Sequence, residues 1–142
     1  MLVRLIYASR SPVPLTEETV AGILAQSRKH NLETGITGVL CVCQGDIYLQ
    51  ALEGGREEVN RLYCKLVRDD RHIDVTLLDY AEISERRFSS WRMGRVDLDK
   101  LNFGVVLKYS ETARLDPFRM SGGVALAFLE ELMGTASIVG GD

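Results

Sequence analysis

The sequence predicts an α+β protein with a ferredoxin-like βαββαβ core, on the evidence of its length, the order of its apolar patterns and one tight turn. At 142 residues the chain suits one domain that buries about two-thirds of its unfolded surface. Extended and helical patterns follow one another as strand, helix, strand, strand, helix, strand. We expect a five-stranded mixed sheet with two helices on one face and carboxyl-terminal helices packed on the other.

The first strand and first helix are separated by two prolines. A strand is expected from Leu2 to Ser9, where both alternating faces are apolar, as at the centre of a sheet. Pro12 and Pro14 then interrupt the chain, and Thr16 before two glutamates is typical of a helix N-cap. The helix is expected to end near residues 28–30, because cations suit the carboxyl end of a helix dipole.

The middle of the chain predicts a hairpin, a second helix and two further strands. Gln44-Gly45-Asp46 is typical of a tight turn between paired strands, and Gly54-Gly55 ends the second of them. We expect the elements in this order: strand Ile36 to Cys43, strand Ile47 to Leu52, helix Glu57 to Arg68, strand Ile73 to Tyr80 and strand Ser90 to Val96.

The segment after about Leu98 predicts further helices, at residues 111–114 and 123–133. An apolar stripe follows the second of these, made of Val124, Ala127, Phe128 and Leu132. We expect this stripe to cover the sheet face that the core helices leave open, and a homodimer contact is the alternative. The chain therefore divides into a core at residues 1–96 and a helical extension at 97–142 of the same globular unit, with residues 136–142 frayed.

Composition argues against several classes of protein. With 17 basic and 20 acidic residues, the net charge of −3 provides no basic field for direct nucleic-acid binding. No apolar run approaches the ~20 residues of a membrane span, and the amino-terminal residues lack a signal-peptide pattern, so we expect a cytoplasmic protein. The three cysteines form no Cys-x-x-Cys pair, which predicts reduced packing residues and no metal site.

Tyr7 and Gln50 are the first pair of candidate functional residues. They fall on the first and third predicted strands, which are neighbours in this fold, and strand parity can direct both side chains toward the helices. The pair is then either a core hydrogen bond that satisfies both groups or the edge of a ligand site. Because rotation of a glutamine amide exchanges donors for an acceptor without moving charge, Gln50 is a candidate switch.

Polar residues near the helix ends form a second candidate group. Asn31 follows the predicted first helix, where asparagine is a common C-cap, and it is also a candidate ligand group. His30 and His72 each follow a helix beside basic residues, which normally means exposed charge that complements the helix dipole. Together with neighbours such as Arg71, they would make the mouth of a cleft between the helices positive, where phosphates can rest.

Motifs for substrate chemistry are weak. Ala8 to Pro12 has neither Walker spacing nor a dinucleotide fingerprint, and no His-Asp partner is expected for Ser9 or Ser11. Glu53 has no carboxylate partner for acid-base catalysis, so we expect a solvated charge or a backbone contact. The alternatives that stay open on these residues are a small acylphosphatase-like hydrolase, which would need a glycine-bearing arginine loop, and a colourless protein-interaction module.

Taken in order, five segments resemble the pattern of the BLUF family of blue-light sensors that use flavin. The resemblance covers residues 1–96, and the segments are Leu5-Ile6-Tyr7-Ala8-Ser9, Asn31 with Ile36-Thr37-Gly38, Gln50-Ala51-Leu52-Glu53-Gly54, Asp69-Asp70-Arg71-His72 and Phe88-Ser89-Ser90-Trp91-Arg92-Met93.

The resemblance implies a noncovalent flavin, usually FAD, with FMN or riboflavin as alternatives. Its ring would lie between Ile23 and Leu66, and Asn31 would bond the carbonyl and imide edge. The expected cofactor-binding residues are Ile23, Ser27, His30, Asn31, Gln50, Leu66, Asp69, Arg71 and His72.

The resemblance also implies a light response rather than enzymatic turnover. Light would move an electron and a proton from Tyr7 to the flavin and leave Gln50 rotated or tautomerised. Trp91 and Met93 would carry the change into the fifth strand, and which of them lies beside Gln50 stays open. The signal would pass through the carboxyl-terminal helices to an unidentified protein partner in trans.

Overall fold

The computed structural model describes residues 1–135 and 137–140. Its strands are β1 Leu2–Arg10, β2 Thr37–Cys43, β3 Ile47–Gly55, β4 Ile73–Ile83 and β5 Gly94–Asp97. Its α-helices are α1 Glu17–Thr34, α2 Arg56–Arg68, α3 Phe103–Tyr109 and α4 Gly122–Met133, with 3₁₀ turns η1 Leu98–Lys100 and η2 Pro117–Arg119.

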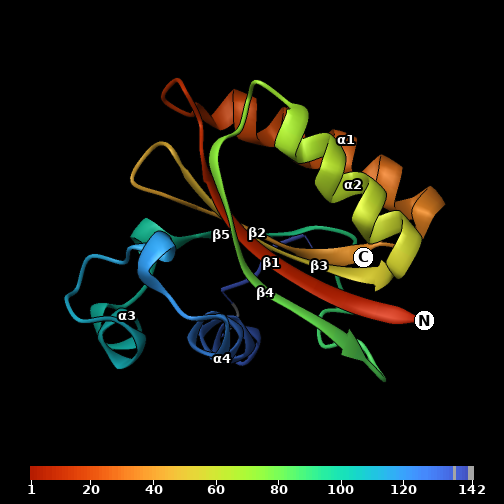
Figure 1. The fold of residues 1–142 in the computed structure, drawn as a ribbon. Helices are drawn as coiled ribbons and strands as arrows, with labels where there is room; N and C mark the ends of the chain where they lie inside the picture. Colours follow the sequence, from red (N-terminus) through yellow and green to blue (C-terminus); the bar gives the residue numbers. More distant parts are fainter. Residues whose placement is uncertain (136, 141–142) are drawn as a thin grey trace.

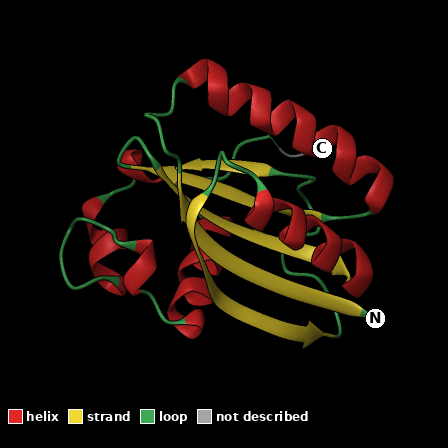
Figure 2. Ribbon diagram, turned by 45° about the horizontal axis from the view of Figure 1, so that its top comes forward, coloured by secondary structure: helices red, strands yellow, loops and turns green. Residues whose placement is uncertain are grey.

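The strands form one mixed sheet in the order β4-β1-β3-β2-β5. Helices α1 and α2 cover one face, whereas α3 and α4 lie on the other (Figure 1, Figure 2). Only the β2–β5 pairing is parallel within this sheet of the described chain. The predicted ferredoxin-like fold, with a five-stranded sheet and the carboxyl-terminal helices on its second face, is therefore confirmed.

The pairing of β1 with β3 sets the register of the candidate site. Tyr7 lies opposite Gln50 in this antiparallel pair, and Leu40 of β2 lies opposite Gln50 on the other side. Gln44 and Gly45 take left-handed backbone angles, with φ of 54° and 80°, and form the predicted turn between β2 and β3. The turn fixes the hairpin register, and with it the face on which Gln50 lies.

Side chains of neighbouring residues on β1 enter two separate apolar cores. Leu5 and Tyr7 pack with residues of α1 and α2, whereas Ile6 packs with residues of α3 and α4. This alternation follows from the period of two in a strand. Both faces of β1 are buried, as predicted for a central strand.

The first helix is longer than predicted. Thr16 is its N-cap and accepts a hydrogen bond from the Thr19 N–H at 3.1 Å, but α1 continues to Thr34. Gly35, at φ 76°, is the C-cap, and its N–H donates to the Asn31 carbonyl. A glycine enters the left-handed region without a Cβ penalty, so the helix ends there. The prediction of Asn31 as a C-cap is wrong.

Two further boundaries differ from the predictions. Strand β5 begins only at Gly94, so Trp91 and Met93 precede it and do not alternate along it. The helix expected at residues 111–114 instead lies at α3, where the Asn102 side chain accepts from the Gly104 N–H and caps the first turn. Local capping therefore decided the position of this short helix.

Helix α4 covers the second sheet face, as predicted, through a slightly different stripe. Ala125, Phe128, Leu129 and Leu132 are buried, whereas Ala127 is exposed. The helix begins at Ser121, whose hydroxyl accepts from the Val124 N–H at 3.2 Å. None of the helices in residues 1–135 and 137–140 is long and apolar enough to cross a membrane.

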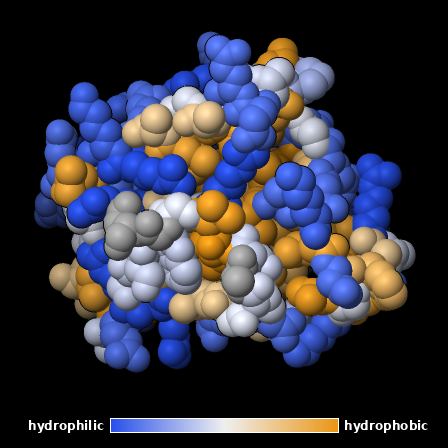
Figure 3. Space-filling view, turned by 180° about the vertical axis from the view of Figure 1, so that it is seen from behind, coloured by the Kyte–Doolittle hydropathy of each residue, from blue (hydrophilic) through white to orange (hydrophobic). Residues whose placement is uncertain are grey.

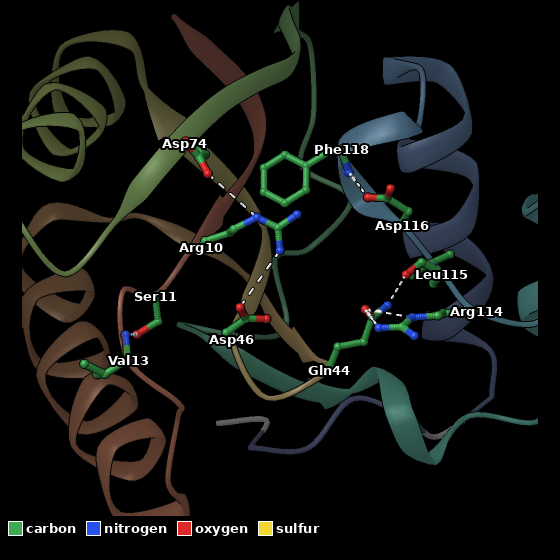
Figure 4. A network of polar contacts seen from close by, with 10 residues as sticks. All are labelled: Arg10, Ser11, Val13, Gln44, Asp46, Asp74, Arg114, Leu115, Asp116 and Phe118. Carbon is green, nitrogen blue, oxygen red and sulfur yellow. Dashed lines mark hydrogen bonds and ion pairs between the residues drawn. The ribbon is translucent and has the colours of Figure 1, made fainter.

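A polar network attaches the segment before α4 to the end of the sheet (Figure 4). The Arg10 guanidinium lies 4.0 Å from an Asp46 carboxylate oxygen and 3.7 Å from one of Asp74, and it stacks over the Phe118 ring at 4.6 Å. In the hairpin turn, the Gln44 amide donates to the carbonyl of Leu115 at 2.5 Å. The extension is thus fixed at the end of β1 and at the β2–β3 turn.

The end of the chain is paired where it is described. Residues 136, 141 and 142, part of the segment expected to be frayed, lie outside the described residues. In residues 137–140, however, Val139 exchanges backbone hydrogen bonds with Arg95 of β5, at 2.8 and 2.9 Å. The prediction of fraying is wrong for this part.

Candidate cofactor site

A cavity of about 140 Å³ lies between the sheet and helices α1 and α2. Ile23 of α1 and Leu66 of α2 contribute apolar walls, and Tyr7 and Gln50 line it from the sheet. Every residue of the predicted cofactor-binding set lines this cavity: Ile23, Ser27, His30, Asn31, Gln50, Leu66, Asp69, Arg71 and His72. The fold therefore brings together residues that are spread over almost fifty positions of sequence.

A hydrogen-bonded chain of three side chains forms part of the cavity wall. The Tyr7 hydroxyl donates to Oε1 of Gln50, and Nε2 of Gln50 donates to the sulfur of Met93 at 3.3 Å. All three side chains are at least 94% buried, with exposed fractions of 0%, 6% and 1%. Because a thioether sulfur is a weak acceptor, the amide nitrogen of Gln50 is its less firmly held end.

Burial controls the protonation of Tyr7. Desolvation raises the pKa of its hydroxyl far above the ordinary value of 10.0, and the neighbouring Tyr48 and Tyr63 raise it further. The Tyr7 ring also lies 5.8 Å from the Tyr63 ring and 6.3 Å from the His72 ring, between centroids. The hydroxyl is therefore protonated at neutral pH and acts as a donor to Gln50.

Helix α1 holds the segment that contains Met93. The Asn31 side-chain nitrogen donates to the Arg92 carbonyl, and Nε of Arg28 donates to the Met93 carbonyl at 3.0 Å. The extension of α1 beyond residue 30 is what places the buried Asn31 within reach of this segment. One N–H of its side-chain amide is engaged by Arg92, and the residue also lines the cavity.

Charged and titratable groups lie at the α2 end of the cavity. Arg71 forms a fork with Asp69, at 2.6 to 3.1 Å, and these hydrogen bonds lower the pKa of Asp69 to about 2. His72 Nδ1 lies 2.9 Å from the Ser9 hydroxyl. Burial lowers the pKa of His72 below 6.5, so its ring is neutral at pH 7.

Ser9 has a histidine neighbour in His72, but the pair does not overturn the expectation that neither serine has a His-Asp partner. Ser9 is completely buried, and within residues 1–135 and 137–140 no hydrogen bond or ion pair joins the other nitrogen of His72 to a carboxylate. A buried hydroxyl cannot reach a substrate carbonyl without rearrangement, so this pair lacks the geometry of a catalytic nucleophile. Glu53 is also fully buried and accepts from the N–H groups of Arg87 and Phe88, the predicted backbone contact.

Trp91 and Met93 lie in different places. Met93 lines the cavity beside Gln50, whereas Trp91 is half-buried against the core on the α3 and α4 side. Trp91 is not among the residues that line the cavity. The geometry thus answers which of the two residues neighbours Gln50.

Sequence reasoning missed five residues that line the cavity: Gln26, Leu40, Tyr48, Leu62 and Lys65. The spacing of these residues in the sequence nevertheless places them beside predicted site residues. Tyr48 shares the strand face of Gln50 through the period of two, and Leu40 is its cross-strand partner. Leu62 and Lys65 lie within one helical turn of Leu66, as Gln26 does of Ile23.

The residues fit a flavin ring system. Two apolar walls suit a planar aromatic ring, and the amides of Asn31 and Gln50 supply the few fixed polar groups expected in such a site. The enclosed volume of about 140 Å³ is below the ~300 Å³ of pockets that enclose a whole drug-sized ligand. The cavity therefore suits the ring of a flavin, and a dinucleotide would extend beyond it.

An α+β fold with this apolar slot and amide edge suits a flavin-binding protein, and comparison with known proteins identifies the family. The model of the BLUF family, "Sensors of blue-light using FAD", matches residues 2–94. The chain therefore belongs to the BLUF family of flavin-binding blue-light photoreceptors. This assignment displaces the hydrolase and the colourless interaction module as descriptions of the chain.

Curated relatives are larger proteins. The chain is 32% identical over 93 residues to photoactivated adenylate cyclase subunit beta of Euglena gracilis, matching 65% of this chain and 11% of that protein. It is 35% identical over 104 residues to the blue light- and temperature-regulated antirepressor BluF of Escherichia coli, matching 69% and 24%. The chain thus spans a quarter or less of the length of these two relatives.

Solved structures of similar size also match. The photo-activated state of BlsA is 31% identical, with a TM-score of 0.78 and coverage of 94% of this chain and 95% of that one. The dark-state structure of BlrB, a BLUF protein, is 30% identical with the same TM-score and coverage of 95% and 96%. The likeness therefore extends through the carboxyl-terminal helices as well as the core.

Proposed function

We propose that Tyr7, Gln50 and Met93 form the light-responsive network of this photoreceptor, and that its signal passes through β5 and the carboxyl-terminal helices to a protein partner. One observation supports this most strongly. Gln50 lines the cavity and has an acceptor bonded to Tyr7 and a donor directed at Met93. A single amide thus contacts the cofactor cavity, a redox-active phenol and the segment that leads into β5.

The flavin ring is held between Ile23 and Leu66, with Asn31 bonding one edge. Ser27 and His30 line the α1 side of the site, and Asp69, Arg71 and His72 line the mouth on the α2 side. When bound, the flavin supplies absorption of blue light and, once excited, an acceptor for an electron. FAD is the family's cofactor, and FMN or riboflavin would satisfy the same ring contacts.

Tyr7 is the electron donor, and its proton leaves with the electron. A phenol that has lost an electron is strongly acidic, and the buried surroundings that raise the pKa of Tyr7 also disfavour a retained positive charge. The hydroxyl proton therefore moves along its hydrogen bond to Oε1 of Gln50. The electron would go to the flavin, and Gln50 would pass a proton on to it from Nε2, which leaves the glutamine as its neutral imidic tautomer, able to turn. Return of one electron and one proton to Tyr7 closes the cycle.

Rotation of the Gln50 amide changes which of its atoms faces the sulfur of Met93. In the resting state the sulfur of Met93 accepts from Nε2 at 3.3 Å, and after rotation it would face Oε1, which cannot donate. Single hydrogen bonds of this kind differ by about 1 kcal/mol, enough to change a two-state population about fivefold. Because β5 begins at the next residue, Gly94, the change is delivered directly to the edge strand. Trp91 would follow as part of the same segment.

The output is a contact with another protein in the cytoplasm. Apolar patches interrupt the hydrophilic surface on the face shown in Figure 3, and among the exposed large apolar side chains are Phe103 of α3, at 69%, and Leu107, at 44%. Exposed apolar groups beside the region that receives the signal are typical of interaction surfaces. Relatives named as adenylate cyclase subunits and an antirepressor support a regulatory output, without fixing the partner.

The test separates flavin binding from the light response. Purified protein loaded with FAD is illuminated with blue light, and its absorption spectrum is recorded before, during and after. We expect Gln50→Leu to keep bound flavin and lose the reversible red shift, and Met93→Ala to keep the shift and change its lifetime. Met133→Ala, outside the cavity, is the matched control. A red shift that persists in Gln50→Leu would contradict the proposed role of the amide.

A further inference from the structure

The segment Ser137–Gly140 packs along the outer edge of β5 at the point where the Met93 segment enters the strand. Its Val139 forms an isolated antiparallel bridge with Arg95. Side chains alternate along an extended segment, and here Val139 is 66% exposed whereas Ile138 packs against the apolar core that includes Trp91. The backbone pairing thus holds one side chain, Ile138, against the protein.

Ile138 occupies the space that Gly94 leaves by having no side chain. A Cβ on Gly94 would lie 2.4 Å from Cγ2 of Ile138 and 3.0 Å from Cγ of Trp91. The first distance is shorter than real Cβ contacts and the second is tighter than most of them, so Ile138 lies directly on the backbone of β5 beside the indole ring. The close approach depends on glycine at this position.

The other end of the segment lies against Arg28. Gly140 has a φ of 91°, and a Cβ there would lie 2.1 Å from a terminal nitrogen of the Arg28 side chain. Arg28 is the residue whose Nε donates to the Met93 carbonyl at 3.0 Å. Through Ile138 the segment contacts Trp91 and Gly94, which lie before and after Met93 in the sequence. Through Gly140 it contacts Arg28, which donates to the Met93 carbonyl.

We infer that Ile138 is a positioning residue of the light response: by packing on Gly94 and Trp91 it holds the Trp91–Gly94 segment where the Met93 sulfur meets Gln50. The inference rests on the proposed function, because it concerns the same hydrogen-bond switch. Ile138 does not line the cavity, so it acts through Met93 and not on the flavin. When Gln50 turns, the segment can move only if Ile138 loosens with it.

The test is the rate at which the red-shifted spectrum of the FAD-loaded 142-residue chain returns in darkness. Ile138→Ala removes packing that stabilises the resting arrangement, so we expect recovery to slow about fivefold. Ile138→Val keeps most of the contact and should recover within about twofold of the unaltered chain. Val139→Ala, one residue away and exposed, is the matched control and should also recover within about twofold of the unaltered chain.

A substitution at Gly94 tests the contact between Ile138 and β5 from the side of the strand. Gly94→Ala introduces a methyl group where Ile138 lies, and it too should slow recovery. Combining Gly94→Ala with Ile138→Ala gives the new methyl group space and should bring recovery back toward the original rate. This pair keeps the inference testable if Ile138→Ala alone fails to fold.

Dependence on Met93 distinguishes positioning from general stability. In a Met93→Ala background, Ile138→Ala should alter recovery less than about twofold, since the group through which it acts is gone. Equal slowing in both backgrounds, or unaltered recovery in Ile138→Ala with a normal red shift, would overturn the inference and leave the proposed function standing. A flavin-loaded chain with no red shift at all would overturn the proposed function instead.

Discussion

The two faces of the central sheet differ in what they bury. The face under α3 and α4 is filled by large apolar side chains, such as Phe88, Phe128 and Leu132, all fully buried. The face under α1 and α2 buries Tyr7, Gln50 and Asn31 around a cavity. Neighbouring residues of one strand serve both faces, because their side chains alternate.

The difference between the faces separates stability from response. Apolar packing gains free energy in proportion to buried area and has one tight arrangement. Buried amides and phenols must be hydrogen-bonded, and their bonds have alternative arrangements of similar energy. The α3–α4 face therefore anchors the sheet, while the α1–α2 face can exchange hydrogen bonds without unfolding. Substitutions on the α3–α4 face should therefore mainly lower the free energy of unfolding, whereas substitutions on the α1–α2 face should mainly change flavin binding or the light response.

The largest effect on stability is expected from Phe128→Ala on the α3–α4 face. Removing a fully buried ring that also packs edge-on against Tyr109 should lower the free energy of unfolding by about 3–5 kcal/mol. Chemical denaturation measures this, with Phe103→Ala, an exposed residue, as the control. A loss below about 1 kcal/mol would mean that this face does not anchor the fold.

Glu53→Gln tests the one fully buried carboxylate among the described residues. Glu53 lies 3.3 Å from Arg4 and accepts from the Phe88 N–H at 2.6 Å. An amide there leaves Arg4 without a countercharge and directs a donor at a donor, so we expect a loss of about 2–3 kcal/mol. Denaturation gives the stability and hydrogen exchange at Phe88 gives the local effect. Unaltered exchange at Phe88 would contradict the assigned contact.

Asn31→Ala should have a smaller effect on stability and a clear one on the cofactor. Losing the bond to the Arg92 carbonyl should cost about 1 kcal/mol of unfolding free energy. Loss of the amide edge should weaken flavin affinity about tenfold. Flavin titration followed by fluorescence measures the second effect, and Asn60→Ala on the exposed side of α2 is the control. Equal flavin affinities in Asn31→Ala and Asn60→Ala would show that Asn31 does not bind the flavin.

The smallest expected effect is a pH dependence from His72. Its pKa is lowered in the folded state, first by burial, so the folded chain binds this proton less readily than the unfolded chain. The stability contribution is thus present above about pH 6.5 and is lost as the pH falls below it. The melting temperature of the unaltered chain should fall more steeply from pH 7.5 to 5 than that of His72→Gln. Parallel curves would contradict this.

Strand positions and the shared cavity were predictable because they follow from local pattern. Alternation placed Tyr7 and Gln50 on one face, and the turn at Gln44-Gly45-Asp46 fixed the register that makes them opposite. The resemblance to the BLUF pattern predicted a set of cofactor-binding residues, all of which line the cavity. These inferences needed only the periods of strands and helices and the order of elements.

Three features of the structure were not predicted. The end of α1 depends on Gly35 as a left-handed cap, and the position of Asn31 follows from it. The placement of Met93 beside Gln50, with Trp91 on the opposite face, arises because β5 starts late and residues 91–93 turn before it. The pairing of Val139 with Arg95 joins segments that carry no shared local signal.

The central claim is that the buried hydrogen bond from Tyr7 to Gln50 initiates the response to light. The most direct measurement is the light-minus-dark absorption spectrum of flavin-loaded Tyr7→Phe beside that of Tyr80→Phe, whose tyrosine is 45% exposed on β4. We expect both variants to fold and bind flavin, Tyr80→Phe to show the reversible red shift, and Tyr7→Phe to show none. A normal red shift in Tyr7→Phe would contradict the account.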